Sequence, residues 1–419
     1  MPDSSGQVPS EFDVIVAGAG PSGSSCAASL GDKGYNVLLL DKAGFPRDKT
    51  CGDAISGKSL RMLQKLGITG KVADAPNAVI NAITFSSPDG SVARIDVPSV
   101  GGKRRFAGYV CRREIFDNIL FQNARSKRTV TAIENAEVAG LVYGEDKKNV
   151  VGVSVKAADG GLQEYYAKVV VGADGANSVV ARSLGIQQNG DGHWCLGIRQ
   201  YWKGVGGIGD SIELHFVDMA VPGYFWIFPS DGGLANVGLG MLVSDKKKKK
   251  IGSLQKLYEG IIANAPLFRE RFAGAKPVSQ LRGWNLPNAS QKRKSYWPGC
   301  ILVGDAASLV DPFTGEGIGN AMTSGAIAAG AIDEAFTYND FSEKSLKRYW
   351  DTLWKEIGPE VDSSYDIQRR VKWKWLLNLV IRKAATKPEF REAIAGTLIN
   401  PDSRNEYRSP LFYLKVFLP

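Results

Sequence analysis

Cys51 and Asp53 are the first residues along the chain whose types and spacing suggest chemistry. They flank Gly52 in residues 45–56, FPRDKTCGDAIS, a segment rich in charged side chains. Arginine and lysine near a thiol favour its thiolate form, which makes the thiol a poorer acid. An aspartate carries a proton at neutral pH only where burial raises its pKa. The segment therefore has three interpretations: a catalyst, a redox centre, or a loop in which a small residue allows a turn.

The other cysteines and the histidines offer Cys51 no partner of disulfide or metal type. The five cysteines are scattered, and no two form a C-x-x-C pair. This pattern predicts reduced thiols in a cytosolic protein rather than a disulfide framework. The two histidines, His193 and His215, are too few to predict a metal centre. No nucleophile-elbow pattern supports a Ser-His-Asp hydrolase.

A glycine-rich turn near the start of the chain predicts a dinucleotide site. The pattern predicts a strand, a helix and a second strand over residues 12–17, 24–32 and 35–40. Gly18, Gly20 and Gly23 form G-x-G-x-x-G between the first strand and the helix, which allows a tight turn, approach of a pyrophosphate and close helix packing. Asp41 ends the second strand, near the spacing of about 20 residues typical of a ribose-binding acid. NAD and FAD both fit this pattern.

Two later turns, each after an apolar strand, decide between the two cofactors. Residues 166–171 lead into GADGANSVVARSLGI, and residues 300–303 lead into GDAASLVDPFTGEGIGNAM. Each turn can place an acid or a backbone amide at the carboxyl end of a strand. Together with RREIFDNIL, which begins at residue 112, they resemble the FAD-binding fingerprints of the para-hydroxybenzoate-hydroxylase-like flavoprotein superfamily. The resemblance implies FAD.

The same resemblance implies roles for individual residues. Asp305 would hold the ribityl chain of FAD, and Arg113 would lie near the pyrophosphate. Residues 315–318 would place a helix N-terminus beside the flavin pyrimidine, where it favours the charge of reduced flavin. Arg47 has two interpretations, contact with FAD or a solvated pair with Asp48, and we predict the first. The predicted FAD-binding residues are Gly18, Gly20, Gly23, Asp41, Lys42, Arg47, Cys51, Gly52, Arg113, Asp174, Gly175, Gly304, Asp305, Pro312, Gly315, Gly317 and Ile318.

Two stretches indicate one branch of that superfamily. One is C-G-D after F-P-R-D-K, and the other is VPGYFWIFPSDGGLANVGLG, residues 221–240. Their combination is similar to the geranylgeranyl reductase family, whose members reduce isolated C=C bonds of polyprenyl chains. The resemblance runs from about residue 12 to about residue 335. It implies an FAD-dependent reductase of a geranylgeranyl-type lipid, with NAD(P)H or ferredoxin as the electron donor.

The aromatic run in the second stretch has two interpretations. Tyr224, Trp226 and Phe228 alternate, so they share one face of a strand, and such a face is typical of a core. The strand is short and bounded by proline and glycine, which favours a pocket wall in a sheet over the flavin. An apolar wall suits an isoprenoid, at about 25 cal/mol per Å² of buried apolar area. We predict a substrate pocket of Tyr224, Phe225, Trp226 and Phe228.

Reduction of an isolated alkene requires a proton as well as a hydride. Because the alkene is not electrophilic, protonation of one carbon must build positive charge on the more substituted carbon, which then accepts hydride from N5 of reduced flavin. Faces of Tyr224, Phe225 or Trp226 can stabilise that charge. Cys51 and Asp53 are the candidate proton sources and our predicted catalytic residues, and a flavin-bound water is a third possibility.

The order of the motifs predicts an α/β fold with discontinuous domains. A Rossmann-like FAD-binding domain would contain residues 1–76, 105–188 and 291–335. A β-rich substrate domain would be inserted into it, with residues 77–104 and 189–290. A helical C-terminal region would follow, over residues 336–419.

Charge and hydrophobicity together predict a cytoplasmic protein that is peripheral at a membrane surface. The net charge is +9, and no window approaches the roughly 20 apolar residues of a membrane span. Residues 246–250 are five lysines, either a solvated loop or a contact with anionic lipid. Residues 371–387, VKWKWLLNLVIRKAATK, either lie at a membrane interface or pack on the catalytic domain. The apolar tail, residues 409–419, would cover the lipid pocket or insert into the bilayer. No metal and no nucleic-acid partner is predicted.

Other proteins with the same predicted fold provide the alternatives. Flavin-dependent halogenases have a W-x-W-x-I-P run, from which Tyr224 and Phe228 depart. An FAD-dependent monooxygenase, acting on an aromatic or isoprenoid substrate, is the main alternative, because oxygen activation has no readable residue signature. A membrane-attached flavoprotein that only passes electrons is the third.

Overall fold

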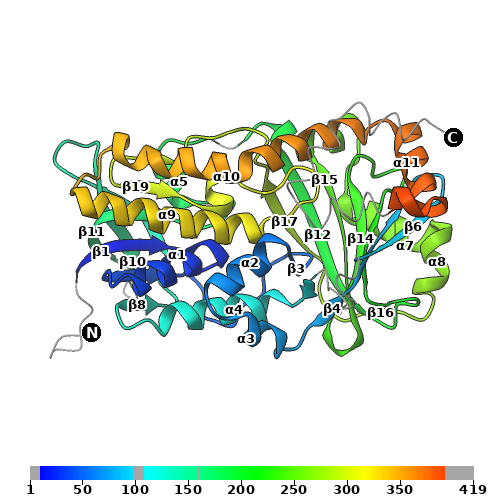
Figure 1. Cartoon of the computed structure of the whole chain (residues 1–419), viewed down its shortest axis with the longest axis horizontal. Coiled ribbons are helices and arrows are strands. Elements are labelled where there is room, and N and C mark those ends of the chain that lie inside the picture. The colour runs from blue at the N-terminus through cyan, green and yellow to red at the C-terminus, as the bar shows by residue number, and fades with distance from the viewer. Residues whose placement is uncertain (1–9, 98–107, 158–159, 188, 392–419) are drawn as a thin grey trace.

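Two large sheets lie side by side along the length of the molecule (Figure 1). The computed structural model describes residues 10–97, 108–157, 160–187 and 189–391. The first sheet has the strand order β18-β19-β11-β1-β2-β8, and β10 and β9 extend it from β11. Its strands are β1 (Glu11–Ala17), β2 (Val37–Leu40), β8 (Val130–Ile133), β9 (Val138–Tyr143), β10 (Val150–Lys156), β11 (Leu162–Gly172), β18 (Tyr296–Trp297) and β19 (Cys300–Leu302).

The central strands of the first sheet are parallel and buried on both faces. β1 pairs in parallel with β2 and β11, and β11 pairs in parallel with β19. All four residues of β2, VLLL, are buried, as expected for a strand covered on both sides. Because these strands are parallel, their carboxyl ends meet at one edge, and the glycine turn after β1 lies there.

Helices lie around that turn and pack either on the first sheet or on neighbouring helices. They are α1 (Pro21–Asp32), α2 (Lys58–Lys65), α3 (Thr69–Ala73), α4 (Arg113–Arg125), α5 (Val179–Ser183) and α9 (Ile318–Tyr338). α1 begins three residues before the predicted start, because proline is well tolerated at the first helical position. α1 and α9 are so close that a Cβ on Gly325 would lie 2.2 Å from the Ser22 carbonyl oxygen. This contact ties the C-terminal half of the chain to the glycine turn.

The second sheet is mostly antiparallel and has the order β16-β12-β15-β14-β13-β5-β6, with β17 beside β12. Its strands are β5 (Ala82–Ser86), β6 (Val92–Asp96), β12 (Trp194–Lys203), β13 (Ser211–His215), β14 (Tyr224–Pro229), β15 (Leu234–Leu242), β16 (Lys276–Pro277) and β17 (Arg282–Pro287). A small sheet of β3 (Ala54–Ser56), β7 (Gly108–Val110) and β4 (Ala78–Ile80) completes the strands.

One face of the second sheet is covered by α7 (Leu254–Asn264) and α8 (Pro266–Phe272), which follow α6 (Val243–Lys248). Tyr258 and Ile261 of α7 and Phe268 of α8 pack in one apolar cluster with Phe225 and Val237 of the sheet. The opposite face is turned toward the first sheet and α2 (Figure 1). The mixed α/β architecture confirms the predicted fold class.

The C-terminal part is helical, with α10 (Glu343–Arg370) and α11 (Lys374–Thr386). α10 runs beside α9 along the first sheet, and α11 lies next to β6 at the far end of the second sheet (Figure 1). The buried side of α11 packs on the sheet, as one interpretation of residues 371–387 expected. No helix in the described part of the chain is long and apolar enough to cross a membrane. The tail, residues 409–419, lies outside the described residues.

Candidate active site

A cavity of about 1400 Å³ extends from the glycine turn of the first sheet to the face of the second sheet that carries Trp226. Gly18, Asp41 and Asp174 line one end, and Phe216 lines the other. The segment predicted to do chemistry, Cys51 to Asp53, lines it between these ends. The fold therefore places the predicted cofactor residues and the predicted substrate wall around one space.

Most predicted cofactor residues line this cavity, and two do not. Gly23 and Gly304 pack against the glycine turn instead. A Cβ on Gly23 would lie 1.8 Å from the Gly18 carbonyl oxygen, and one on Gly304 would lie 2.8 Å from Ser22 Oγ. The residues that do line the cavity are Gly18, Gly20, Asp41, Lys42, Arg47, Cys51, Gly52, Arg113, Asp174, Gly175, Asp305, Pro312, Gly315, Gly317 and Ile318.

The glycine turn fits a pyrophosphate. Gly18 has φ +103, and a Cβ there would lie 2.4 Å from the Ala173 carbonyl oxygen, so only glycine fits. The N-cap of α1 is Gly20, which provides no side chain to cap the helix. The first backbone N–H groups of α1 therefore stay available for an anion in the cavity.

Asp41 holds the turn in place as well as lining the cavity. Its Oδ2 accepts a hydrogen bond from the Ala19 N–H at 2.8 Å, and its Oδ1 accepts one from the Ala43 N–H at 2.9 Å. These bonds fix the carboxylate at the end of β2. A ribose at this position would meet an acceptor held in a fixed position, as expected for a dinucleotide site.

Two arginines share one buried carboxylate beside the cavity. Arg113 donates from Nε and Nη2 to both oxygens of Asp117, at 2.6 and 2.7 Å. Arg47 Nη1 donates to Asp117 Oδ2 at 3.1 Å. The alternative pair of Arg47 with Asp48 is wrong, because Asp48 pairs with Arg199 at 2.7 Å. Arg47 Nη2 also lies 4.0 Å from Asp41 Oδ2. Both arginines line the cavity, and guanidinium groups bind phosphate oxygens well, so this wall suits a diphosphate.

Asp53 is fully buried and only partly hydrogen-bonded. Its Oδ2 accepts hydrogen bonds from Tyr201 Oη at 2.5 Å and from Asn236 Nδ2 at 2.7 Å. Its Oδ1 has no partner among the described residues. The backbone of Asp53 has φ +67, a left-handed conformation that aspartate tolerates better than most residues. The loop thus holds one carboxylate oxygen unpaired beside the cavity.

The same environment gives Asp53 and Cys51 different acidities. Burial raises the pKa of Asp53 to about 6, although Arg199 and the bonds from Tyr201 and Asn236 lower it. Burial also raises the pKa of the Cys51 thiol, and the nearby charge of Arg113 does not compensate. The expected shift of Cys51 toward thiolate is therefore wrong. Both groups can carry a proton near neutral pH, and Asp53 is the stronger acid.

The aromatic wall is held by hydrogen bonds and by close glycine contacts. Trp226 Nε1 donates to Asn236 Oδ1 at 2.9 Å, and Tyr224 Oη donates to the Thr314 carbonyl oxygen at 2.5 Å. A Cβ on Gly52 would lie 2.8 Å from Phe228 Cε2. Glycine between Cys51 and Asp53 is therefore needed for that loop to lie against the wall.

Phe225 does not belong to this wall, so its prediction as a pocket residue is wrong. It is fully buried on the opposite face of β14, where its ring centroid lies 4.9 Å from that of Phe268. Successive residues of a strand point to opposite faces. Tyr224, Trp226 and Phe228 can therefore line the cavity together, and Phe225 is directed into the core under α7 and α8.

The sequence interpretation missed three residues that hold the loop: Arg199, Tyr201 and Asn236. Arg199 and Tyr201 are on β12, and Asn236 is on β15, directly opposite Tyr201. Asn236 is fully buried in the otherwise apolar run LANVGLGML. A polar residue at an inward position of an alternating strand is the signal that could have revealed it.

A lysine and a tryptophan at the cavity were also missed. Lys49 and Trp284 both line it, and the Lys49 Nζ lies 4.2 Å from the centroid of the Trp284 ring. Burial lowers the pKa of Lys49 to about 8, and the charge of Asp305 partly compensates. Protonated Lys49 adds positive charge near Asp305, the residue predicted to hold the ribityl chain of FAD.

Comparison with known proteins supports FAD binding by this chain. A family model described as "FAD binding domain" matches residues 11–253. Digeranylgeranylglycerophospholipid reductase 2 of Methanopyrus kandleri is 33% identical, over 83% of this chain and 83% of that protein. A digeranylgeranylglycerophospholipid reductase of Methanocaldococcus jannaschii is 32% identical, over 86% of each chain.

Solved structures show the same fold. A geranylgeranyl bacteriochlorophyll reductase-like protein from Thermoplasma acidophilum superposes with a TM-score of 0.80 at 22% identity, over 95% of this chain and 98% of that one. A flavin-dependent brominase gives a TM-score of 0.70 at 20% identity, over 95% and 92%. The sequence matches confirm FAD as the cofactor. The chain belongs to the geranylgeranyl reductase family of FAD-binding flavoproteins.

Proposed function

We propose that this protein saturates C=C bonds of a geranylgeranyl-type lipid. The observation that carries the proposal is a single cavity that joins the FAD-binding turn, a buried partly paired carboxylate and an aromatic wall. The named relatives are reductases of digeranylgeranylglycerophospholipid. Reduced FAD, when bound, supplies the hydride. NAD(P)H or ferredoxin would provide its electrons.

In this proposal Asp53 holds the proton that the alkene receives. Its pKa of about 6 lies close to neutral pH, where a general acid is most effective. Tyr201 and Asn236 both bond to Oδ2, so Oδ1 is the carboxyl oxygen that has no partner among the described residues. Cys51 lines the cavity nearby with a thiol that is a weaker acid. We therefore assign Cys51 to shaping the site.

The wall of Tyr224, Trp226 and Phe228 would exclude water and face the alkene. Aromatic faces stabilise a nearby cation by about 0.5–2 kcal/mol, more where water is excluded. The rings of Trp226 and Phe228 lie 6.3 Å apart between centroids, and Asn236 fixes the Trp226 indole. The wall therefore has a fixed orientation relative to Asp53, which binds the same asparagine.

Anaerobic reduction of the holoenzyme tests the proposal. The flavin is reduced with dithionite, and a geranylgeranyl lipid is added without oxygen. Flavin reoxidation with a product heavier by two hydrogens per turnover is expected, and the fully saturated lipid is the control that gives no reoxidation. Reoxidation only after oxygen is admitted, with a hydroxylated product, would instead establish the monooxygenase alternative.

Cys51→Ser separates the two candidate acids. We expect the variant to keep its FAD and most of its turnover, because serine keeps the size of the side chain. Loss of alkene reduction with normal FAD content would show that the thiol takes part in the chemistry and would overturn the assignment of Asp53 as sole acid.

The lipid substrate also implies contact with a membrane. A geranylgeranyl lipid partitions into a bilayer. The cavity has an apolar end, lined by Phe85, Ile95, Phe216 and Phe313. We propose that the protein is cytoplasmic and binds the membrane peripherally. Its basic net charge of +9 is consistent with an anionic surface.

A further inference from the structure

The first turn of α11 exposes two tryptophans between lysines. Trp373 and Trp375 are 54% and 59% exposed, and Lys372 and Lys374 alternate with them. Tryptophan is among the less exposed residue types, and exposed apolar groups that gather on one surface mark interaction sites. The buried side of the same helix is directed into the protein. The amphipathic stripe of α11 therefore does not account for these two rings.

Contacts join this turn to the lysine run near α6, which is more than 120 residues away in the sequence. Lys374 Nζ lies 2.6 Å from a carboxylate oxygen of Asp218. Lys249 Nζ donates to the carbonyl oxygens of Asp218 and Met219, at 3.5 and 3.3 Å. Lys372 Nζ lies 4.0 Å from a carboxylate oxygen of Asp245.

These contacts define one surface, which we name the α6–α11 surface. It contains a third exposed apolar side chain, because Met219 is 51% exposed. Its residues are Met219, Lys249, Lys372, Trp373, Lys374 and Trp375.

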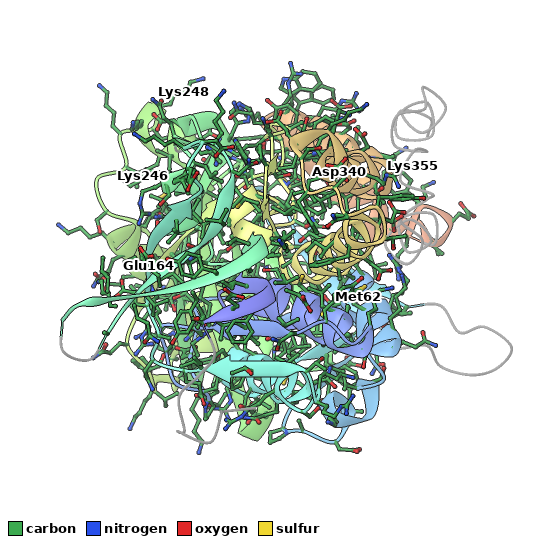
Figure 2. The ribbon with its side chains drawn as sticks, turned by 90° about the vertical axis from the view of Figure 1, so that its left-hand side faces the viewer. Met62, Glu164, Lys246, Lys248, Asp340 and Lys355 are labelled. Atoms are coloured by element: carbon green, nitrogen blue, oxygen red, sulfur yellow. The ribbon has the colours of Figure 1, made fainter. Side chains whose placement is uncertain are left out.

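The surroundings of this surface are positively charged. Seven lysines, Lys372, Lys374 and those of residues 246–250, have three carboxylate partners among the described residues, Asp191, Asp218 and Asp245. Lys246 and Lys248, both residues of α6, lie at the edge of the molecule (Figure 2). Exposed aromatic rings surrounded by excess positive charge match the interface of an anionic bilayer, where tryptophan sits at headgroup depth and lysines contact the lipid phosphates.

The α6–α11 surface is also next to the apolar end of the cavity. Leu376, Leu377 and Ile381 of α11 pack in one cluster with Ile95 and Phe216. Ile95 and Phe216 themselves line the cavity. The buried side of α11 therefore packs directly on the residues that line the space proposed to receive the lipid.

We propose that the α6–α11 surface docks on an anionic lipid bilayer, with Trp373, Trp375 and Met219 in the interface. Docking in this orientation turns the apolar end of the cavity toward the membrane. This inference rests on the proposed lipid substrate, and it names the surface through which the enzyme reaches that substrate.

Co-sedimentation with vesicles tests the surface directly. Full-length holoenzyme is mixed with vesicles of phosphatidylcholine alone or with phosphatidylglycerol added. We expect binding to the anionic vesicles to weaken about tenfold or more in Lys249→Gln/Lys372→Gln, since each lysine near an anionic surface contributes up to about fivefold. Lys344→Gln/Lys347→Gln on α10 is the matched control and should bind nearly as the unmodified protein does. The proposal would be overturned if the two double variants bound anionic vesicles equally well, or if the unmodified protein bound both vesicle types equally well.

A second measurement reports on the tryptophans. Vesicles with brominated acyl chains should quench part of the tryptophan fluorescence of the unmodified protein, and this part should be lost in Trp373→Phe/Trp375→Phe. Tyr338→Ala is the control for an exposed aromatic elsewhere, because Tyr338 is 71% exposed and ends α9, beside the first sheet. Unchanged quenching in the double variant would place the interface on another surface.

Activity on detergent-dispersed lipid separates this inference from the proposed function. The surface variants should keep their kcat with dispersed lipid and show a raised KM with lipid in anionic vesicles. An unmodified protein that binds vesicles but reduces no dispersed lipid would refute the proposed reaction and leave the docking surface standing. Loss of kcat on dispersed lipid in the surface variants would show that these residues act on the cavity and not on docking.

Discussion

The two faces of the second sheet each bury a carboxylate, and the two carboxylates are held differently. On the cavity face, Tyr201 and Asn236 bind one oxygen of Asp53, and its other oxygen has no partner among the described residues. On the opposite face, Arg271 donates to both oxygens of Glu213, at 2.6 and 2.8 Å, and His215 Nε2 lies 2.9 Å from one of them. Asp53 and Glu213 are both buried, but only Glu213 has hydrogen-bond partners on both carboxylate oxygens among the described residues.

The difference in pairing determines the charge. Burial raises the pKa of Glu213 by itself, but Arg271 and His215 lower it below the usual value. Glu213 therefore stays ionised where Asp53 can hold a proton. Ser86 Oγ lies 2.8 Å from His215 Nδ1, which gives a Ser-His-Glu series like that of a hydrolase. All three residues are buried and none lines the cavity, so this series is a structural network.

The comparison shows that burial alone does not make a carboxylate reactive. A buried charge whose partners are complete stabilises the fold, and a buried group with an open position beside a cavity is available for chemistry. Single substitutions on each face of the second sheet can test this distinction.

Replacing Asp53, the proposed proton donor on the cavity face, should have the largest effect on turnover. Asp53→Asn keeps the shape of the side chain and loses the acid, so we expect kcat to fall about 10²- to 10⁴-fold. FAD content should stay close to that of the unmodified protein. Single-turnover reoxidation of the reduced flavin measures the change. A variant with unchanged turnover would exclude Asp53 as the proton source.

Removing the carboxylate on the opposite face should act on stability instead. Glu213→Ala leaves Arg271 without its bidentate partner, which we expect to cost about 3 kcal/mol of unfolding free energy. Chemical denaturation measures it, and turnover per folded molecule should not change. Glu213→Ala/Arg271→Met, which removes both charges, should recover part of the loss. A fall in turnover without a fall in stability would contradict the structural role.

Substitutions of two neighbouring aromatic residues of β14 should likewise affect stability in one case and turnover in the other. Phe225→Ala creates a cavity in the core under α7 and α8 and should cost about 3 kcal/mol of stability. Trp226→Phe keeps an aromatic face but loses the bond to Asn236, so we expect about a tenfold fall in kcat with little change in melting temperature. Equal loss of stability in both variants would show that β14 has no specialised face.

The pH dependence should distinguish the two acids. Turnover that depends on protonated Asp53 should fall about tenfold per pH unit above its pKa of about 6. The bond from Tyr201 lowers this pKa, so Tyr201→Phe should move the fall in turnover to higher pH, by about one unit or less. An unchanged pH profile in Tyr201→Phe would argue against Asp53 as the titrating group.

The contributions of Asp53 and Glu213 to stability should change with pH in opposite directions. The pKa of Asp53 is raised from 3.8 to about 6, so its contribution is fully present below pH 3.8 and is lost as the pH rises through about 6. The pKa of Glu213 is lowered from 4.5, so its contribution is present above that pH and is lost as the pH falls. Melting temperatures of Asp53→Asn and Glu213→Gln against pH, relative to the unmodified protein, should diverge accordingly.

Much of the cofactor half was predictable because its interactions are local. G-x-G-x-x-G, the acid at Asp41 and the later turns each lie at the end of a strand, and parallel strands bring such ends to one edge. The alternation of Tyr224, Trp226 and Phe228 likewise predicted a shared face. The error over Phe225 arose from treating neighbours in the sequence as neighbours in the pocket.

The acidity of the site could not be predicted in the same way. Tyr201 and Asn236 are 148 and 183 residues from Asp53 along the chain, and each lies on a different strand. The basic neighbours of Cys51 in the sequence suggested a thiolate, but burial acts more strongly than they do. The contacts of Lys249 and Lys374 with Asp218 are equally a product of the fold.

The family, FAD and the strand ends predicted to bind it could be inferred from the order of residues alone, because short motifs place backbone and side chains within a few residues of each other. The folded structure was needed to show which carboxylate has an unpaired oxygen, which face of β14 meets the cavity and which surface carries both lysines and exposed tryptophans. Burial, pairing and charge excess depend on residues brought together from distant segments, and no local pattern encodes them.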